Sequence, residues 1–461
     1  MFDAAIYSQR RDRLKKEIKS GICLFLGNKE IAMNYAANPF HFRQDSDFLY
    51  FFGLDSPGLD AVVDVDEDQD ILFGDYIDME DIIWMGPQPK FKRRAKSVGV
   101  KRTSPSGVLL GYVRNALKQG RRVHFLPPYQ ADRSLKLRSL LGIDPDAVGD
   151  YVSEDLITAV VKQRSVKIKE EIEEMELALE TTYDMYLEAM KAIKPGLTEQ
   201  EIVGHLEGAA LRAGAQTAFP TILTVNGQIL HNHHHGNIMK KGDLLVIDSG
   251  AESPMHYAAD ITRTFPVSGK FTPKQKAIYE IVLKTQTDAI AGMKPGIVNK
   301  DIHLSAARTI TEGLRDIGLM KGNVDESIIS GAHALFFPHG LGHMIGLDVH
   351  DMEGLGENYV GYDRSVQRSD QFGLAYLRMA KRLKTGYVLT VEPGIYFIPA
   401  LIDQWESEKK HGRFINYAML QEYRGFGGIR IEDDVLVTAK GYRELGRGIP
   451  KTVEDIEALM V

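Results

Sequence analysis

Cysteine is nearly absent from this sequence, in which Cys23 is the only one among 461 residues. A single thiol excludes an intrachain disulfide and any metal site built from several thiolates. No apolar segment reaches the ~20 residues that a membrane-spanning helix needs. The N-terminus carries Asp3 early and has no basic stretch ahead of an apolar run, so we expect no signal peptide. Together these absences favour a cytoplasmic protein that does not bind membranes.

An excess of positive charge is also absent, since the formal net charge is −7. This balance offers no electrostatic reason for binding nucleic acid or an anionic membrane, and we expect neither as a partner. The hydrophobic fraction of 44% and the charged fraction of 26% are ordinary for a globular protein. A chain of this length is sufficient for two or three domains.

The first part of the chain predicts a mixed α/β domain. We expect strands at 21–27, 61–65, 70–73 and 122–125, and helices at 10–18 and 107–119. Alternation of this kind is typical of a sheet covered by helices. Nothing in this part indicates catalysis. Trp84 lies in an apolar segment, which favours a place in the core or at an interface over a contact with substrate.

A basic stretch at 161–169 leads into a strongly helical run at 170–193, so we predict two domains, 1–165 and 166–461. Within the second domain, residues 192–202 match residues 292–302. In each copy one helix ends at Lys-Pro-Gly and another follows, with Thr198 and Asn299 as suitable N-caps. This period is too long for a solenoid. It predicts a duplicated α/β unit with pseudo-twofold symmetry and a ligand site in the groove between its halves.

Two aspartates mark the centre of the second domain. An apolar run ends at Asp248 and a second β-branched run begins at Asp260, with turn residues between them, which predicts a β-hairpin. A turn centred near Pro254 would place the two aspartates directly opposite, with Cβ atoms about 4.5–5.5 Å apart. Facing carboxylates repel unless a cation lies between them. On the hairpin alone, the alternative is that one aspartate caps a turn and the other is solvated.

Two glutamates also end or interrupt apolar strands. Glu392 follows the run Val388–Val391, and Glu432 shares a strand face with Arg430 because strand side chains alternate with a period of two. Each has a simpler interpretation. Glu392 could cap a strand, and Glu432 could pair with Arg430.

Histidines gather in two segments. The segment 337–351 carries His339, His343 and His350, and His231 precedes a histidine run at 233–235. A lone buried histidine is more often a hydrogen-bonded core residue than a ligand, and the run at 233–235 is typical of a solvated loop. No single histidine therefore indicates a site.

The combination is more specific than any of its parts. Buried carboxylates are almost always paired or metal-bound, and four are expected in or beside apolar strands: Asp248, Asp260, Glu392 and Glu432. Four negative charges match two divalent cations, and the His343 imidazole would complete the set. An oxygen-rich site with one nitrogen favours Mn²⁺, with Co²⁺ or Zn²⁺ as alternatives. Two such cations about 3.5–4 Å apart hold a bridging hydroxide at neutral pH and polarise a carbonyl, which is hydrolytic chemistry.

The order Asp, Asp, His, Glu, Glu resembles the proline-specific metallopeptidases of the pita-bread fold, namely Xaa-Pro aminopeptidase (aminopeptidase P) and prolidase. The similar segments extend over nearly the whole chain, at 42–51, 247–251, 259–266, 339–343, 348–351, 390–396 and 429–434. The resemblance implies an N-terminal α/β domain of the aminopeptidase P type. It also implies a C-terminal pita-bread (creatinase/aminopeptidase) domain.

The resemblance implies a role for each metal ligand. Asp248 would bind one metal ion, and His343 and Glu392 the other. Asp260 and Glu432 would bridge both ions. Glu392 would also act as the general base or acid that takes a proton from the bridging water.

Four further residues receive roles from the same resemblance. His231 and His350 would contact the substrate carbonyl and the developing tetrahedral intermediate. His339 would line the pocket, and Arg430 would hold carboxylates that support the metal ligands.

Two activities remain open on the sequence. We favour an aminopeptidase that removes the first residue from peptides with proline at the second position. The first alternative is an Xaa-Pro dipeptidase, because Arg378 matches the place where an arginine grips the dipeptide carboxylate in eukaryotic prolidase. A second alternative is a catalytically inactive binding protein on the same fold. Such proteins usually lose metal ligands, whereas all five are present here.

The resemblance also implies a homodimer or homotetramer, because a residue at the place of Trp84 can reach a partner's active site in family members. Two departures from the family pattern are visible. The interval between Asp248 and Asp260 is one residue longer than in common members, which predicts a bulge or a longer turn. The segment 398–424 is longer than in typical aminopeptidase P.

Overall fold

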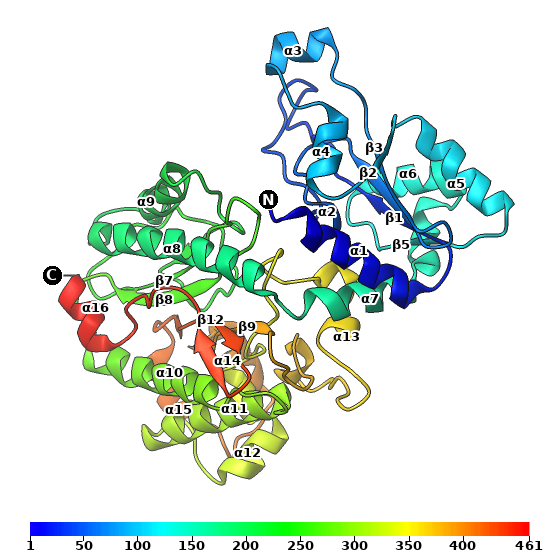
Figure 1. Ribbon diagram of the computed structural model, residues 1–461. Coiled ribbons are helices and arrows are strands. Elements are labelled where there is room, and N and C mark those ends of the chain that lie inside the picture. Colours follow the sequence, from blue (N-terminus) through cyan, green and yellow to red (C-terminus); the bar gives the residue numbers. More distant parts are fainter. Residues whose placement is uncertain (461) are drawn as a thin grey trace. The chain divides into compact units, whose positions relative to one another are not determined.

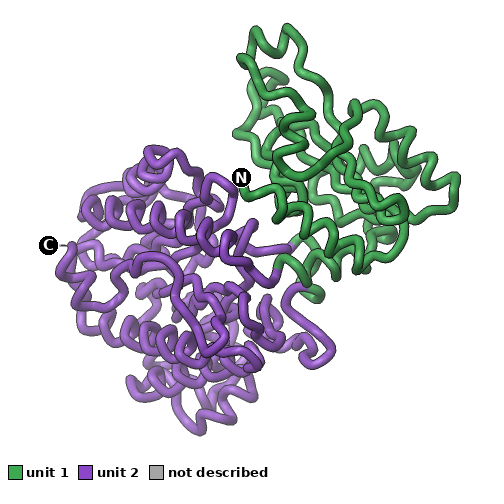
Figure 2. The backbone as a smooth tube through the Cα atoms, viewed as in Figure 1, with its two compact units in different colours: residues 1–164, 354–359 green, residues 165–353, 360–461 purple. Residues whose placement is uncertain are grey.

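The computed structural model describes residues 1–460, which form two compact units (Figure 2). Unit 1 comprises Met1–Arg164 together with Gly354–Tyr359, and unit 2 comprises Ser165–Glu353 and the chain from Val360 onwards. No sequence pattern predicts that the short segment 354–359 belongs with unit 1. Within residues 1–460, no helix is both long enough and apolar enough to span a bilayer.

Unit 1 is built on a five-stranded sheet with the order β4-β3-β2-β1-β5. The strands are β1 Ile22–Leu26, β2 Asp60–Asp64, β3 Gln69–Phe73, β4 Arg102–Ser104 and β5 Val123–Phe125. The sheet is mixed, because β1 pairs antiparallel with β2 and parallel with β5, while β3 pairs parallel with β4. The four strands expected from apolar runs are present. The fifth, β4, was missed because its three residues are polar and none is buried.

Unit 1 also contains helices, which lie around this sheet (Figure 1). They are α1 Ala4–Ile18, α2 Ser46–Phe52, α3 Met79–Met85, α4 Phe91–Ser97, α5 Val108–Lys118, α6 Ala131–Leu141, α7 Glu154–Arg164 and the 3-10 helix η1 Pro145–Tyr151. Apolar residues of α5 and α6, such as Val113 and Leu137, pack with strand residues in one core. In contrast, α3 has no buried residue. Trp84 on α3 is 77% exposed, so the core interpretation of this residue is wrong.

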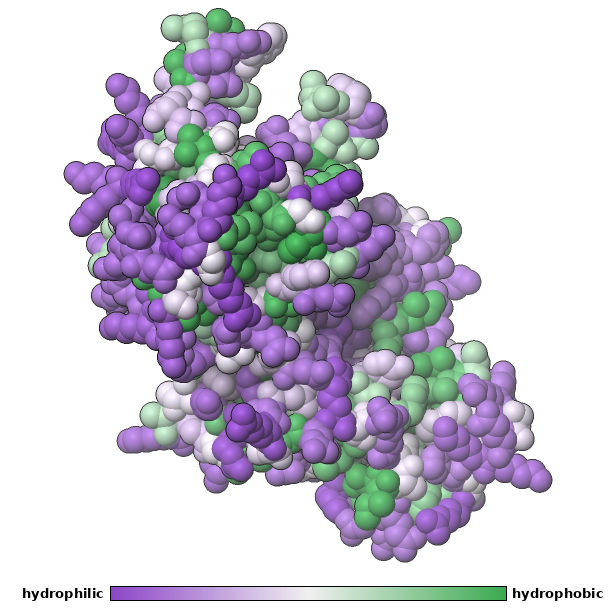
Figure 3. All heavy atoms as spheres, turned by 90° about the vertical axis from the view of Figure 1, so that its right-hand side faces the viewer, coloured by the Kyte–Doolittle hydropathy of each residue, from purple (hydrophilic) through white to green (hydrophobic). Residues whose placement is uncertain are grey.

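Several large apolar residues of α3 are exposed, and green side chains gather at the top of the view in Figure 3, where this helix lies. An interface remains the prediction for Trp84.

Unit 2 contains the duplicated halves that the repeat predicts. The first half consists of α8 Lys169–Ala192, α9 Glu199–Arg212, β6 Ile222–Thr224, β7 Leu244–Ser249 and β8 Ile261–Pro266. The second half begins with α10 Pro273–Ala291 and α11 Asn299–Asp316 and continues to β9 Val388–Val391, β12 Asp433–Val437 and β13 Tyr442–Glu444. Each half thus has a helix pair followed by a three-stranded sheet, β6-β7-β8 in one and β13-β12-β9 in the other.

The two copies of the repeat have the same local structure. Gly196 and Gly296 adopt φ values of 96° and 92°, which glycine reaches without steric cost. The backbone N–H of Gly196 donates to the carbonyl of Met239 at 2.9 Å, and that of Gly296 donates to the carbonyl of Leu383 at the same distance. Thr198 caps α9 as predicted. Asn299 does not cap α11, because its side chain donates to the carbonyl of Met379 instead.

The remaining elements of unit 2 connect and flank the second sheet. A short sheet pairs β10 Gly394–Tyr396 with β11 Gly428–Arg430. The longer segment 398–424 folds into α14 Pro399–Ser407, α15 Tyr417–Leu420 and the 3-10 helix η5 Gln421–Tyr423. Trp405 is buried there and packs edge-on against Phe372. The other elements of unit 2 are α12 Val324–Ser330, α16 Val453–Leu459, η2 Ala332–Leu335 and η4 Leu374–Tyr376. The short elements η3 Glu353–Leu355 and α13 Glu357–Val360 lie mostly in the segment 354–359 that belongs to unit 1.

Candidate metal centre

The hairpin of β7 and β8 carries Asp248 and Asp260, but the two aspartates are not directly opposed. Asp248 pairs with Thr262, and no bulge interrupts the register between residues 244 and 266. The turn is centred one residue later than predicted, so the predicted opposition is wrong. Of the two predicted alternatives, a bulge or a longer turn, the bulge is not found between residues 244 and 266. Because strand faces alternate with a period of two, Asp260 lies on the face of Thr262, diagonal to Asp248.

The directly opposed carboxylates belong instead to the two glutamates. Val391 pairs with Asp433 where β9 meets β12, and Gly394 pairs with Arg430 where β10 meets β11. The second ladder continues the first without a shift in register. Glu392 and Glu432 fall in the gap between them and therefore lie opposite each other. Like charges placed this way destabilise a sheet unless a cation compensates them.

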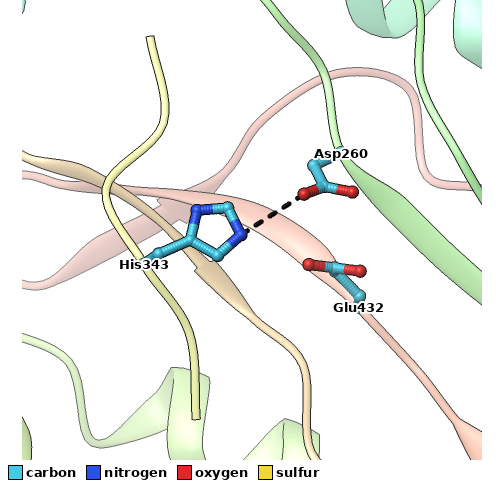
Figure 4. Close-up of side chains that lie close together, drawn as sticks. All are labelled: Asp260, His343 and Glu432. Atoms are coloured by element: carbon cyan, nitrogen blue, oxygen red, sulfur yellow. Dashed lines mark ion pairs between the residues drawn. The ribbon is translucent and has the colours of Figure 1, made fainter. Parts of the chain in front are cut away.

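Three side chains from distant parts of unit 2 converge on one point (Figure 4). One ligand atom each of Asp260, His343 and Glu432 lies within 4.8 Å of the others, and all three residues are buried. His343 Nε2 is 3.4 Å from Asp260 Oδ2 and 3.8 Å from Glu392 Oε1. Two carboxylates and an imidazole around one buried space match the ligand chemistry of a divalent cation.

Backbone contacts fix the ring of His343. Its Nδ1 donates to the carbonyl of Met344 at 3.0 Å, and its backbone N–H donates to Thr390 Oγ1 at 3.1 Å. Nε2 is therefore the unprotonated nitrogen, and it is the one turned toward the carboxylates. Burial holds the pKa of His343 well below its ordinary value. The imidazole is thus neutral, which is the form that binds metal.

Arg430 connects Asp248 to this cluster. Its Nη2 lies 2.5 Å from Asp248 Oδ2, its Nε donates to Thr262 Oγ1 at 3.0 Å, and its Nη1 donates to the Tyr396 hydroxyl at 3.1 Å. The Thr262 hydroxyl in turn donates to Glu432 Oε2 at 2.6 Å. Arg430 therefore pairs with a predicted metal ligand itself, rather than with a carboxylate outside that set. Its link to Glu432 passes through Thr262.

Positive charge compensates the carboxylates of the cluster only in part. Burial and neighbouring carboxylates raise the pKa of Asp260 and of Glu432 well above the ordinary values, and burial raises the pKa of Glu392 to about 7. Within residues 1–460, Asp248 Oδ1 and Asp260 Oδ1 are buried without a hydrogen-bond partner. Buried oxygens of this kind need a partner. The residues therefore fit divalent metal ions.

The other predicted histidines lie around this centre. His339 donates from Nδ1 to the Gly340 carbonyl at 2.8 Å and accepts at Nε2 from the Tyr396 hydroxyl at 2.9 Å. The ring of His350 packs edge-on against His343, with centroids 4.3 Å apart. His231 lies in an exposed turn. Desolvation of its ring and the charge of Arg430 lower the pKa of His231.

A buried ion pair holds the loop that carries His350. Lys167 Nζ lies 2.7 Å from Asp351 Oδ2, and both side chains are 1% exposed. The backbone N–H of Asp351 donates to the carbonyl of Met344, beside His343. Removing one partner of such a pair would leave a buried charge uncompensated. The loop is therefore fixed in place on the side of the metal centre.

Sequence reasoning missed four residues of the site. Thr262 and Asp434 could have been found from the period of two, since each lies two residues beyond a predicted ligand; Asp434 Oδ2 accepts the backbone N–H of Asp260 at 3.1 Å. Tyr396 ends the segment 390–396 that resembles the family, but its hydroxyl contacts depend on tertiary structure. Glu353 contacts His350 from a loop, and no sequence pattern signals it.

Two family models match the chain. The metallopeptidase family M24 matches residues 173–439, and the aminopeptidase P N-terminal domain matches residues 7–124. The first match contains all five predicted metal ligands.

Named relatives, and proteins of known structure, are similar to this chain over almost its whole length. The Xaa-Pro dipeptidase of Homo sapiens is 35% identical over 97% of this chain and 91% of its own length. A probable Xaa-Pro aminopeptidase of Sordaria macrospora is 33% identical over 96% and 91%. Zn-substituted aminopeptidase P of E. coli in complex with product is 31% identical, with a TM-score of 0.80 and coverage of 100% and 98%. Pseudomonas aeruginosa aminopeptidase PepP is 30% identical, with a TM-score of 0.81 and the same coverage.

Proposed function

Because this chain belongs to metallopeptidase family M24, we propose that it is an Xaa-Pro aminopeptidase, a metallo-exopeptidase that removes the first residue from peptides with proline at the second position. The observation that carries the proposal is the convergence of Asp260, His343 and Glu432 around one buried space. Divalent cations there would lower the pKa of a water molecule and polarise the scissile carbonyl.

Five side chains would hold two metal ions. We assign Asp248 to one ion and His343 with Glu392 to the other, while Asp260 and Glu432 would serve both. The set is rich in oxygen and has one imidazole nitrogen and no thiolate. This chemistry favours Mn²⁺, with Co²⁺ or Zn²⁺ as alternatives.

We assign the proton transfer to Glu392. Its side chain is 18% exposed, compared with 7% for Asp260 and 11% for Asp248, so it borders the space that substrate can enter. A carboxylate there can take a proton from the attacking water and deliver it to the departing proline nitrogen. The scissile bond is a tertiary amide, because proline has no N–H. Like the nitrogen of any amide, the proline nitrogen must gain a proton as it leaves.

The histidines would handle the substrate. His231 and His350 would contact the scissile carbonyl and the tetrahedral intermediate, and His339 would line the pocket. His339 is oriented for this by the Tyr396 hydroxyl, which Arg430 also contacts.

Replacing His350 by alanine is expected to leave the metal content unchanged and to lower kcat on the order of 10²-fold. The ring packs against His343 but is not among the proposed ligands, so its loss removes a substrate contact and no coordination bond. Steady-state kinetics and elemental analysis of the same preparation would check this. The exposed His234→Ala is the matched control. Loss of metal from the His350 variant would contradict the assigned role.

An Xaa-Pro dipeptidase is the second candidate, because Arg378 lies near the proposed substrate residues. Its Nε is 3.6 Å from Glu353 Oε2, the oxygen that also contacts His350. A guanidinium at this place could bind the carboxylate of a dipeptide. The human relative is named a dipeptidase.

A comparison of Xaa-Pro with Xaa-Pro-Xaa separates the two activities. With added Mn²⁺, kcat/KM is expected to be at least about tenfold higher for the tripeptide, since each factor of ten needs only about 1.4 kcal/mol of added transition-state binding. Initial rates on matched peptides that differ only by the third residue measure this ratio. Cleavage of the dipeptide alone would replace the aminopeptidase proposal with the dipeptidase.

We also propose a homodimer or homotetramer that works in the cytoplasm. Exposed apolar side chains on α3, Trp84 among them, support an interface at this helix. Cys23, the single cysteine, is a buried free thiol, which is compatible with a reducing compartment such as the cytoplasm.

A further inference from the structure

A carboxylate that has no part in the reaction described above lies beside His350. Glu353 Oε2 is 2.5 Å from Nδ1 of His350, three residues earlier in the same loop. The same imidazole packs against His343. His350 therefore contacts both an acidic side chain and a proposed metal ligand.

This contact determines which nitrogen of His350 faces the substrate. A carboxylate can only accept, so the proton of this short hydrogen bond resides on Nδ1. Within residues 1–460, Nε2 makes no hydrogen bond to the protein, and it is the nitrogen left for substrate. A carboxylate bound to one imidazole nitrogen fixes both the rotation and the tautomer of the ring.

Glu353 is itself held in place. Arg378 Nε lies 3.6 Å from the oxygen that contacts His350. The hydrogen bond from His350 and the charge of Arg378 keep the pKa of Glu353 below its ordinary value, so the side chain remains ionised. The buried pair of Lys167 and Asp351 fixes the same loop independently. A substitution at position 353 should therefore leave the fold intact.

We propose that Glu353 is a positioning residue that holds the imidazole of His350 with Nε2 toward the substrate. The inference rests on the proposed role of His350 in peptide hydrolysis. Glu353 acts through that ring, and it is not among the metal ligands.

A double-mutant cycle tests the proposal against an effect through Arg378. Glu353→Gln is expected to lower kcat about tenfold or more while KM and metal content change little, and Glu353→Asp should restore part of the loss. In the His350→Ala background, Glu353→Gln is expected to change kcat less than about twofold, because the residue through which it acts is gone. An undiminished effect in that background would show that Glu353 acts through Arg378 or the loop, and would overturn the proposal. Asp363→Asn is the matched control, because the Asp363 carboxylate is exposed and accepts hydrogen bonds from Ser365.

Nitrogen-15 NMR of histidine-labelled, Zn²⁺-loaded protein tests the same proposal without substrate. The His350 resonances, identified by their loss in His350→Ala, are expected to report a protonated Nδ1 in the wild type and a changed protonation pattern in Glu353→Gln. Unchanged His350 resonances in Glu353→Gln would overturn the proposal. If Glu353→Gln shows the expected change but the wild-type protein cleaves no Xaa-Pro peptide, the result would support positioning by Glu353 and contradict the proposed function.

Discussion

Replacing Glu432 by alanine is expected to reduce Xaa-Pro hydrolysis to the uncatalysed background, and Asp260→Ala is expected to do the same. Both carboxylates lie in the cluster with His343, and both are proposed to serve the two metal ions at once. Loss of either should therefore release both ions, and with them the activated water and the polarised carbonyl. Elemental analysis should show metal falling from two ions per chain toward none, in parallel with kcat.

Glu432→Gln separates the charge of this residue from its packing. Glutamine preserves the volume, and its amide oxygen can still accept the hydrogen bond that Thr262 donates. The variant should fold like the wild type and still lose metal, because only the negative charge is removed. Full activity in Glu432→Gln, or metal retained in Glu432→Ala, would contradict the ligand assignment.

Stabilisation by Mn²⁺ is expected to increase as the pH rises from about 5 to 8. Burial raises the pKa of Glu392 from 4.5 to about 7, and the pKa values of Asp260 and Glu432 are raised as well. In the metal-free protein these groups stabilise the fold below the ordinary pKa, and that contribution is lost as the pH rises through the folded value. Metal binds the ionised carboxylates, so at higher pH it restores the stability that the metal-free protein has lost. At lower pH protons compete for the same carboxylates, and metal binds more weakly.

The difference in Tm between metal-loaded and metal-free protein measures this effect. Buried His303 and His333, whose pKa values are lowered to about 3 and about 4 by burial, contribute with the opposite sign. They lie outside the proposed ligand set, so their contribution cancels in the difference. Metal at 1,000 times its Kd should add about 4 kcal/mol. A Mn²⁺-induced shift that is equal at pH 5.5 and pH 7.5, or larger at pH 5.5, would contradict the account.

Local patterns in the sequence predicted much of this fold. The strands of unit 1 that were expected from apolar runs are present, and the repeated Lys-Pro-Gly segments occupy equivalent places in the two halves of unit 2. Gly196 and Gly296 even share a left-handed backbone conformation. Such features depend on residues close together in the chain, which is why sequence reasoning could reach them.

The pairing between distant strands could not be predicted from the sequence. A shift of one residue in the turn after β7 changed the partner of Asp248 from Asp260 to Thr262. The opposed acids are Glu392 and Glu432, whose register depends on strands about 40 residues apart. Glu353 lies three residues after His350, and the local conformation of this loop brings the two side chains into contact. For the two strand pairings, the hydrophobic period identifies the face of a strand but does not set its partner.

Anomalous diffraction from crystals of the Mn²⁺-loaded protein would show whether the five side chains bind two metal ions. We expect two anomalous peaks about 3.5–4 Å apart, enclosed by the five proposed ligands Asp248, Asp260, His343, Glu392 and Glu432. Density without peaks among these side chains, or manganese bound only elsewhere, would contradict the account and favour a non-catalytic binding protein on this fold.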